Sequence, residues 1–549
     1  MSKKQSKTLW LLLYSFTALI IFIFPLLTLV SKSIETPNGF GLLNFASVLK
    51  SNRTLQAIQN TLILGVGSTL ISTVLGLSMA IIISYTNVRF KKTFELLTIL
   101  PFVIPGYITT LSWTSVFAVS SPINQLLRHF HLPIVNLYSM GGMIFILGIS
   151  NAALVYLNVV DILRKIPVEQ EWASQISGYG ILTTLRKINL PSAKYGIASG
   201  VILSFLSTID NFAIVSTLGT PGGIPVLSTY IYEKAIGFGP NSFNEAAVLS
   251  IFLSVIAFLG IAFRSYILRK SVIIDTEKPR SNDRIILSPS KKYFTETILF
   301  VLLLALNILP LVTMFFSSLQ IGYSRSIFDV SNMGLDNYLF IFSAPSMYNA
   351  FWNSLFLTVA AIAVCMLISI GAAYYKARID AKATQLLEIG ASITYSTPGI
   401  VLALSMIFYW SNVPNVYGTI IILFIAYVTR YFLVIFNGAN TAITSIPYDL
   451  EKSAQISGSK SRQIWREIIL PLMKNQLFSS SFLMFSGAFT ELTLSSLLAA
   501  ANTKTIGLTI YNLQTSGDTN TAQAYSVLLT VFILLLLFSR NHFLAKEDE

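Results

Sequence analysis

The chain carries the sequence IPVEQEWASQISGYGILTTLRKINLP at residues 166–191, and a close copy, IPYDLEKSAQISGSKSRQIWREIILP, at residues 446–471. The two copies lie 280 residues apart, align without a gap and are identical at 11 of 26 positions. Each copy is polar and lies between long apolar runs. Because the apolar core of a membrane does not need such a segment, its duplication indicates a function carried twice by one chain.

The composition is that of a membrane protein. Of the 549 residues, 54% are hydrophobic and 11% are charged, whereas about 25% are charged in an ordinary soluble domain. The formal net charge of +13 is scattered between apolar runs, so we expect no nucleic-acid partner. The single cysteine, Cys365, can form no internal disulfide. His129 and His131 form an isolated pair, which leaves a metal site as an open alternative.

Twelve apolar runs predict twelve transmembrane helices of about 20 residues or more. Because backbone groups in lipid must hydrogen-bond within their own segment, the expected fold class is an all-α polytopic membrane protein. The first run is too long for the apolar region of a signal peptide, so we interpret it as a retained span. The predicted spans lie near residues 9–30, 58–84, 94–118, 140–160, 197–218, 246–268, 296–319, 353–375, 386–410, 416–437, 477–499 and 522–541.

The distribution of lysine and arginine predicts the orientation of these spans. With the N-terminus in the cytoplasm, 29 of the 37 Lys and Arg residues fall in cytoplasmic segments and 7 on the opposite side. Cytoplasmic loops of membrane proteins carry this excess. We therefore expect a multi-pass protein of the cell membrane, inserted in the lipid bilayer, with both termini and both copies of the repeated stretch in the cytoplasm.

Shorter matches extend the repeat over most of the chain. Pro105-Gly106 corresponds to Pro398-Gly399. The predicted domains are a first transmembrane half at 1–270, a hydrophilic cytoplasmic linker at 271–292, and a second transmembrane half at 293–549. With six spans each, the halves are parallel repeats related by an axis along the membrane normal. Such an axis encloses a central path, which is typical of a transporter.

Within each copy of the repeated stretch, the pattern predicts a short helix, a turn and a helix that re-enters the membrane. The first helix is expected to stop at Gly178, and the next helix to begin near Pro191. Gly458 and Pro471 take these positions in the second copy. The alternative interpretation is a pair of ordered loops without a partner.

At these residues the stretch resembles the EAA loop of the permeases of binding-protein-dependent ABC importers, in which small residues precede a glycine and Leu-Pro follows twelve and thirteen positions later. In that family the loop forms the coupling helix that contacts the ATPase subunit. Trp172 and Lys452 hold the position of the family's glutamate, and the nearest carboxylates lie one residue earlier. The resemblance implies an ATPase-coupling role for Glu171, Ala173, Ser174, Gly178, Glu451, Ser453, Ala454 and Gly458.

The overall layout is similar to the fused, two-half permeases of the ferric-iron (Fbp) type. Thr490-Glu491-Leu492-Thr493 resembles the Lys-Glu-Leu-Pro of that group, and Asp210-Asn211-Phe212 resembles an Asp-Phe pattern. The resemblance implies a type I importer permease (MetI-like) fold, with about 12 helices in two parallel repeats of six. It also implies an importer permease for ferric iron, although fused permeases for thiamine and related ones for phosphonates and polyamines share the layout.

The chain carries no ATP site of its own, because it lacks the G-x-x-x-x-G-K-[ST] motif. We therefore expect a permease that is not itself an enzyme and has no cofactor. ATP and Mg would be bound by two copies of a separate ATPase subunit. An extracytoplasmic binding protein would deliver substrate to the loops at 219–245 and 500–521. The alternative from another class is an ion-coupled secondary transporter, which has no ATPase for the repeated stretch to contact.

Two carboxylates, Asp210 and Glu491, lie near the middle of predicted spans. The 280-residue spacing aligns Asp210 with Thr490 and Asn211 with Glu491, so each half places one carboxylate at about the same depth. Such a charge is costly unless it faces protein or water. One interpretation is a translocation path for cations, lined by Asp210, Asn211 and Glu491; the other is structural pairing, with Arg430 neutralising Glu491.

Overall fold

The computed structural model describes residues 12–36, 39–118, 121–237, 239, 241–269, 284–322, 326–379 and 382–545. Most of the predicted linker, residues 271–283, lies outside these ranges. The described chain is helical apart from one antiparallel pair of two-residue strands, β1 (Glu35–Thr36) and β2 (Gly39–Phe40). Below, the N-terminal part means described residues up to 269, and the C-terminal part means those from 284 onward.

Eight helices of the described chain are long and apolar enough to cross a membrane, or up to eleven when sharply bent pairs are counted as spans. Each corresponds to one predicted run. They are Leu12–Ile34 (with η1, Ala18–Ile23, and α2, Phe24–Ile34), α4 (Asn52–Tyr85), α8 (Met140–Lys165), α15 (Ser242–Leu268), Pro289–Ser318 (α16, Pro289–Leu303; η3, Leu304–Ile308; α17, Leu309–Ser318), α19 (Pro345–Ile379), α22 (Ile420–Ser445) and α28 (Thr519–Ala545).

Two of the remaining predicted spans, 94–118 and 386–410, are broken at a proline. The chain bends by 104° between α5 (Lys91–Val103) and α6 (Gly106–Val116), and by 117° between α20 (Lys382–Ser396) and α21 (Gly399–Trp410). Proline has no N–H and disfavours helical geometry in the residue before it. Continuous spans were therefore the wrong prediction here; the prolines do not merely kink the helices but end them.

The other two predicted spans, 197–218 and 477–499, are broken at polar residues. Asn211 separates α12 (Lys194–Asp210) from α13 (Phe212–Gly219), and residues 490–492 separate α25 (Leu470–Phe489) from α26 (Thr493–Leu498). The Asn211 side chain accepts a hydrogen bond from Ile214 N at 2.9 Å, and Glu491 accepts one from Leu494 N at 3.0 Å. A side chain that caps a new helix stabilises a break within the membrane, which hydropathy alone did not predict.

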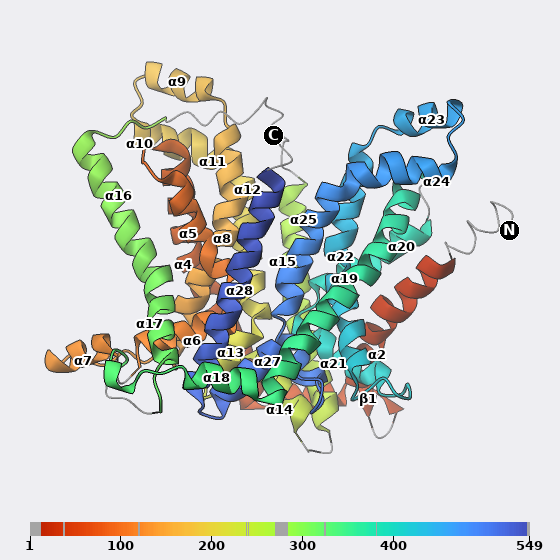
Figure 1. The fold of residues 1–549 in the computed structure, drawn as a ribbon, viewed down its shortest axis with the longest axis horizontal. Coiled ribbons are helices and arrows are strands. Elements are labelled where there is room, and N and C mark those ends of the chain that lie inside the picture. The colour runs from red at the N-terminus through yellow and green to blue at the C-terminus, as the bar shows by residue number, and fades with distance from the viewer. Residues whose placement is uncertain are drawn as a thin grey trace.

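Short elements cover the two ends of the long helices (Figure 1). At the upper end in that view lie α9 and α23, on opposite sides of the molecule; α7, α14 and α18 lie at the lower end. The short helices are α3 (Leu43–Lys50), α7 (Pro122–His129), α9 (Val168–Ile176), α10 (Ile181–Thr184), η2 (Leu185–Asn189), α11 (Leu190–Ser192), α14 (Leu227–Ile236), η4 (Val330–Asn332), α18 (Asp336–Ser343), α23 (Tyr448–Ile456), α24 (Ser461–Ile464), η5 (Trp465–Ile469) and α27 (Ile506–Thr515).

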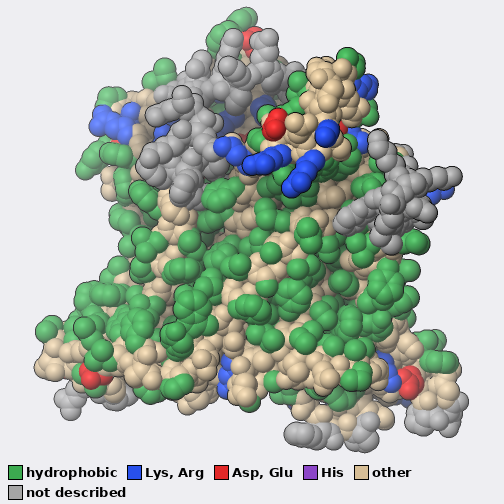
Figure 2. All heavy atoms as spheres, turned by 45° about the vertical axis from the view of Figure 1, so that its right-hand side comes forward, with side chains coloured by type: hydrophobic (Ala, Val, Ile, Leu, Met, Phe, Trp, Pro, Cys, Tyr) green, Lys and Arg blue, Asp and Glu red, His purple; other side chains and the backbone are tan. Residues whose placement is uncertain are grey.

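The N-terminal and C-terminal parts interlock. Helix α2 packs on α21 of the C-terminal part, and α17 packs on α6 of the N-terminal part. Phe24 of α2 and Tyr409 of α21 are 6.2 Å apart between ring centroids across the first of these contacts. Figure 2 shows apolar side chains over the middle of the molecule and Lys and Arg gathered at the upper end, near α9 and α23. This is the surface expected of a protein whose middle lies in lipid.

Candidate functional site: two matching end helices and a central charge cluster

Helices α9 and α23 have the same construction. Each begins after a proline in extended conformation, Pro167 or Pro447. Each is followed by a glycine with positive φ, +81° at Gly178 and +84° at Gly458. A Cβ added to either glycine would meet no atom within 4 Å, so only the backbone conformation requires glycine there. The two copies of the repeated sequence therefore fold into two copies of one local structure.

Side chains of these helices divide into an outward and an inward face. Ile176 and Ile456 are each 88% exposed, which is unusual for isoleucine on an ordered helix. Trp172, Ala173, Lys452 and Ser453 are exposed as well. An apolar residue displayed in the same way on two matching helices at one end of the molecule is typical of a surface that binds a partner.

The predicted coupling residues are thus not all on the outward face. Glu171 and Glu451 are buried, at 6% and 1% exposure, and each forms an ion pair with an arginine. Ser174 is buried too, with its hydroxyl 2.8 Å from that of Thr184. Ala454 is half-buried. Sequence reasoning overlooked Ile176 and Ile456, although the identical Gln-Ile pair in both copies was a usable signal.

In the middle of the molecule, Asp210 and Arg430 hold the break between α20 and α21. Asp210 Oδ2 lies 2.6 Å from Arg430 Nη2, and Asp210 Oδ1 accepts a hydrogen bond of 2.6 Å from Gly399 N. Arg430 also donates to the carbonyl of Thr397. Both sides of the break at Pro398 are therefore bound, one by each member of the ion pair. Since Asp210 belongs to α12 and Arg430 to α22, the pair also joins the N-terminal part to the C-terminal part.

Glu491 has different partners from those expected. Its carboxylate accepts a hydrogen bond of 2.5 Å from the Tyr431 hydroxyl and caps α26. The ion pair of Arg430 is made with Asp210, so the predicted pairing with Glu491 is corrected. Asn211 lies next to Asp210 and caps α13. Formal charges of Asp210, Arg430 and Glu491 sum to −1, which leaves one uncompensated negative charge among these three residues.

A cavity of about 320 Å³ lies beside this cluster in the C-terminal part. It is lined by residues of α20, α22 and α25 that carry no formal charge, among them Asn437, Gln476 and Ser479. Because α22 runs from Arg430 toward α23, the cavity lies on the α23 side of the cluster. Polar and apolar side chains both line this cavity.

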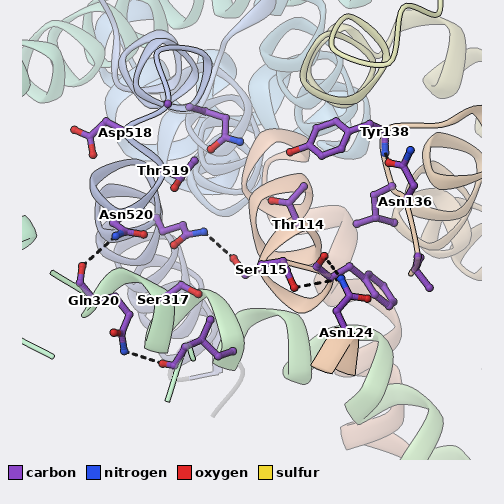
Figure 3. Close-up of a pocket in the computed structure, with 18 of the residues that line it drawn as sticks. Thr114, Ser115, Asn124, Asn136, Tyr138, Ser317, Gln320, Asp518, Thr519 and Asn520 are labelled. Carbon is purple, nitrogen blue, oxygen red and sulfur yellow. Dashed lines mark hydrogen bonds between the residues drawn. The ribbon is translucent and has the colours of Figure 1, made fainter. Parts of the chain in front are cut away.

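A larger cavity of about 730 Å³ opens at the opposite end, between α6, α7, α17 and α28 (Figure 3). Of its 20 lining residues, 11 carry a hydroxyl or a carboxamide group, and Asp518 adds a carboxylate. Gln523 donates to Ser115 Oγ at 2.8 Å, which joins the two parts of the chain across the cavity. Residues 517–520 of this lining fall in the predicted docking loop 500–521.

The isolated histidine pair does not assemble into a larger ligand set. His129 and His131 are exposed at the end of α7. Among the described residues, no group of three or more His, Cys, Asp or Glu side chains is arranged to hold a metal ion.

The chain was compared with known families and proteins. Residues 72–272 and 365–545 match the family described as "Binding-protein-dependent transport system inner membrane component". The chain belongs to this family. It is a helical, polytopic permease, the inner-membrane component of an ABC importer. Its resemblance to the permeases of binding-protein-dependent importers is confirmed.

Two relatives that align along most of the chain are named as ferric-iron permeases. The chain is 24% identical over 506 residues to the ferric transport system permease protein FbpB of Actinobacillus pleuropneumoniae, covering 89% of this chain and 72% of the relative. It is 23% identical to the Fe(3+)-transport system permease protein FbpB 2 of Haemophilus influenzae, covering 92% and 93%. A 2-aminoethylphosphonate transport system permease protein, PhnU of Salmonella choleraesuis, is 29% identical over 42% of this chain and 81% of its own length.

Proposed function

We propose that this protein is the permease subunit of an ATP-driven importer that moves ferric iron released by an extracytoplasmic binding protein. The observation that carries the proposal is the pair of matching helices, α9 and α23, which display the same exposed isoleucine at the same end of the molecule. Two equal surfaces fit a partner that is itself a symmetric dimer. An ATPase dimer formed by two copies of one subunit, binding ATP and Mg, is such a partner.

We place the α9 and α23 end in the cytoplasm, with residues 1–270 and 293–549 as parallel six-span repeats. The excess of Lys and Arg supports this orientation. The opposite end then faces the binding protein, with the cavity of Figure 3 and the loops 219–245 and 500–521 toward it. ATP-driven closure of the ATPase dimer would bring α9 and α23 together and open the path between the two halves at the outer side.

Ferric iron is the favoured substrate for two reasons: the names of the relatives that align along most of the chain, and the net negative charge of the central cluster. Three relatives that align along most of the chain are named for ferric-iron transport. The excess negative charge of the Asp210, Arg430 and Glu491 cluster attracts a cation and disfavours a bare anion such as a phosphonate. The phosphonate permease aligns with less than half of the chain, so this substrate is the second candidate.

The test is reconstitution of the permease in liposomes with its ATPase and its binding protein. We expect ATP-dependent uptake of radioactive Fe(III) that requires all three components, and no uptake of 2-aminoethylphosphonate. Uptake of the phosphonate but not iron would replace the substrate and keep the mechanism. Uptake that runs on an ion gradient without an ATPase would refute the proposed function.

A further inference from the structure

The two buried glutamates of the repeated stretch are held by guanidinium groups in the same way. Arg378 donates to Glu451 Oε1 at 2.8 Å and to the carbonyl of Ile446 at 2.9 Å. Arg284 donates to Glu171 Oε1 and, at 2.7 Å, to the carbonyl of Ile166. Glu171 and Ile166 are the residues that lie 280 positions before Glu451 and Ile446. Each arginine therefore ties the start of one end helix to the glutamate on its inward face.

The two arginines come from different places in the chain. Arg378 lies at the end of α19, the long helix of its own half. The corresponding position at the end of α4 is Tyr85, because a spacing of 293 residues relates Tyr85 to Arg378 as it relates Pro105 to Pro398. Tyrosine carries no positive charge to pair with Glu171. Arg284 belongs instead to the segment that joins the two halves.

The Tyr85 ring packs against the guanidinium group of Arg284. The Arg284 guanidinium lies 4.8 Å from the centre of the Tyr85 ring, which is cation–π distance. The Tyr85 hydroxyl accepts a hydrogen bond of 2.8 Å from Asn189, and Asn189 also donates to Glu171 at 2.6 Å. The network thus contains α4, α9 and the segment before α12, with Arg284 at its centre.

The joining segment is fixed along the end of α4 by its backbone. The amides of Arg284 and Ile285 both donate to Tyr85 O, at 2.9 and 2.8 Å. Leu287 N donates to Asn87 Oδ1 at 3.0 Å. Farther along, Glu296 accepts a bond of 2.6 Å from Arg89 N. These bonds hold residues 284–287 in an extended conformation along residues 85–87.

The network is buried, so the charge of Arg284 matters. The side chains of Arg284 and Glu171 are 4% and 8% exposed, and those of Arg378 and Glu451 are 10% and 1% exposed. A carboxylate that loses its partner in such a site must either move toward water or take up a proton. Either response would release the inward face of α9 from the protein.

We propose that Arg284 is a positioning residue for α9. The segment that joins the two halves then helps to fix the first coupling surface in place, in addition to linking the halves. It supplies from outside the first half the positive charge that α19 supplies within the second. In consequence, the position of α9 depends on an arginine from outside its own half, and the position of α23 does not. This inference rests on the proposed function only for the identity of the partner that contacts α9.

The test is side-specific cross-linking to the ATPase subunit. Cys365 is the chain's one cysteine and is buried, so a cysteine introduced at Ile176 or Ile456 is the accessible one. In the otherwise unchanged chain, both Ile176→Cys and Ile456→Cys should cross-link to the ATPase. Adding Arg284→Gln should lower cross-linking at position 176 by about tenfold or more and leave position 456 unchanged. Arg378→Gln should do the reverse, and Lys291→Gln, at an exposed cation of the same joining region, should change neither.

A second variant separates positioning from folding. Tyr85→Arg combined with Arg284→Gln places the guanidinium where Arg378 stands in the other half, and we expect it to restore cross-linking at position 176 to within about twofold of the parent chain. The comparison holds even if Arg284→Gln alone fails to accumulate in the membrane. Equal cross-linking with and without Arg284, or no rescue by Tyr85→Arg, would overturn the inference. Absence of cross-linking at both positions in the parent chain would instead refute the proposed function.

Discussion

Asp210→Asn is the substitution whose effect follows most directly from the structure. The Asp210 carboxylate accepts one hydrogen bond from Gly399 N and forms the ion pair with Arg430, both at 2.6 Å. Asparagine keeps the volume and can still accept the bond from Gly399. It cannot neutralise Arg430, which then remains charged beside the carbonyls of the broken helix.

The expected magnitude lies between two limits. A fully buried ion pair that loses one partner costs about 3–5 kcal/mol, and an exposed pair contributes less than about 1 kcal/mol. The side chains of Arg430 and Asp210 are 16% and 33% exposed, so the site is intermediate. We expect a loss of about 2 kcal/mol, which is a factor of about 30 in an equilibrium constant.

A double-mutant cycle measures this energy. Asp210→Asn, Arg430→Gln and the double variant would be unfolded in detergent, and the coupling energy of the pair taken from the cycle. The matched control is Glu233→Gln with Arg53→Gln, because this pair has the same separation of 2.6 Å but side chains 51% and 56% exposed. We expect coupling of about 2 kcal/mol in the first cycle and below about 1 kcal/mol in the second. Coupling below about 0.5 kcal/mol for Asp210 and Arg430 would refute the reasoning.

Three further outcomes are expected. Asp210→Asn combined with Glu491→Gln should reduce Fe(III) uptake while the ATPase still co-purifies, because it removes the negative charge of the path and leaves the end helices intact; unchanged uptake would exclude a path role. Gly178→Ala and Gly458→Ala should each destabilise the chain by about 1 kcal/mol in thermal unfolding. The reason is that both glycines have a left-handed backbone, and neither has an atom close enough to clash with a Cβ. The control is Gly180→Ala, which has equal space and a φ of −73° and should leave the stability unchanged. Glu491→Ala should destabilise by about 1–2 kcal/mol because α26 loses its cap, whereas Glu491→Gln should keep nearly full stability, and equal losses for the two would show that the cap is unimportant.

The sequence predicted the parts of the site that are local. The repeated stretch alone specified a helix that stops at Gly178 or Gly458, because a proline before a helix and a glycine after it act within a few residues. The pairing of Asn211 with Glu491 by the 280-residue spacing was also visible in the sequence. Their shared task, which is capping a new helix after a break, was not visible, because hydropathy does not distinguish a polar residue in a continuous span from one at a break.

What the sequence did not predict depends on long-range contacts. Glu171 and Glu451 were expected on the surface that meets the ATPase, yet both are buried because arginines distant in sequence turn them inward. Arg430 was expected to pair with Glu491 of its own half, but the interlocking of the two parts brings Asp210 closer. Arg284 lies in a hydrophilic linker whose composition gives no sign of a buried ion pair. In each case, the deciding partner lies at a distance that periodicity and local motifs do not report.

The central claim is that α9 and α23 are moved together by a nucleotide-driven dimer. It is tested most directly by the distance between spin labels on Ile176→Cys and Ile456→Cys, measured by pulsed electron paramagnetic resonance in the complex with the ATPase. The account predicts a shorter distance when ATP is bound without hydrolysis than in the nucleotide-free complex, and return to the longer distance after hydrolysis. A distance that does not respond to ATP would contradict it.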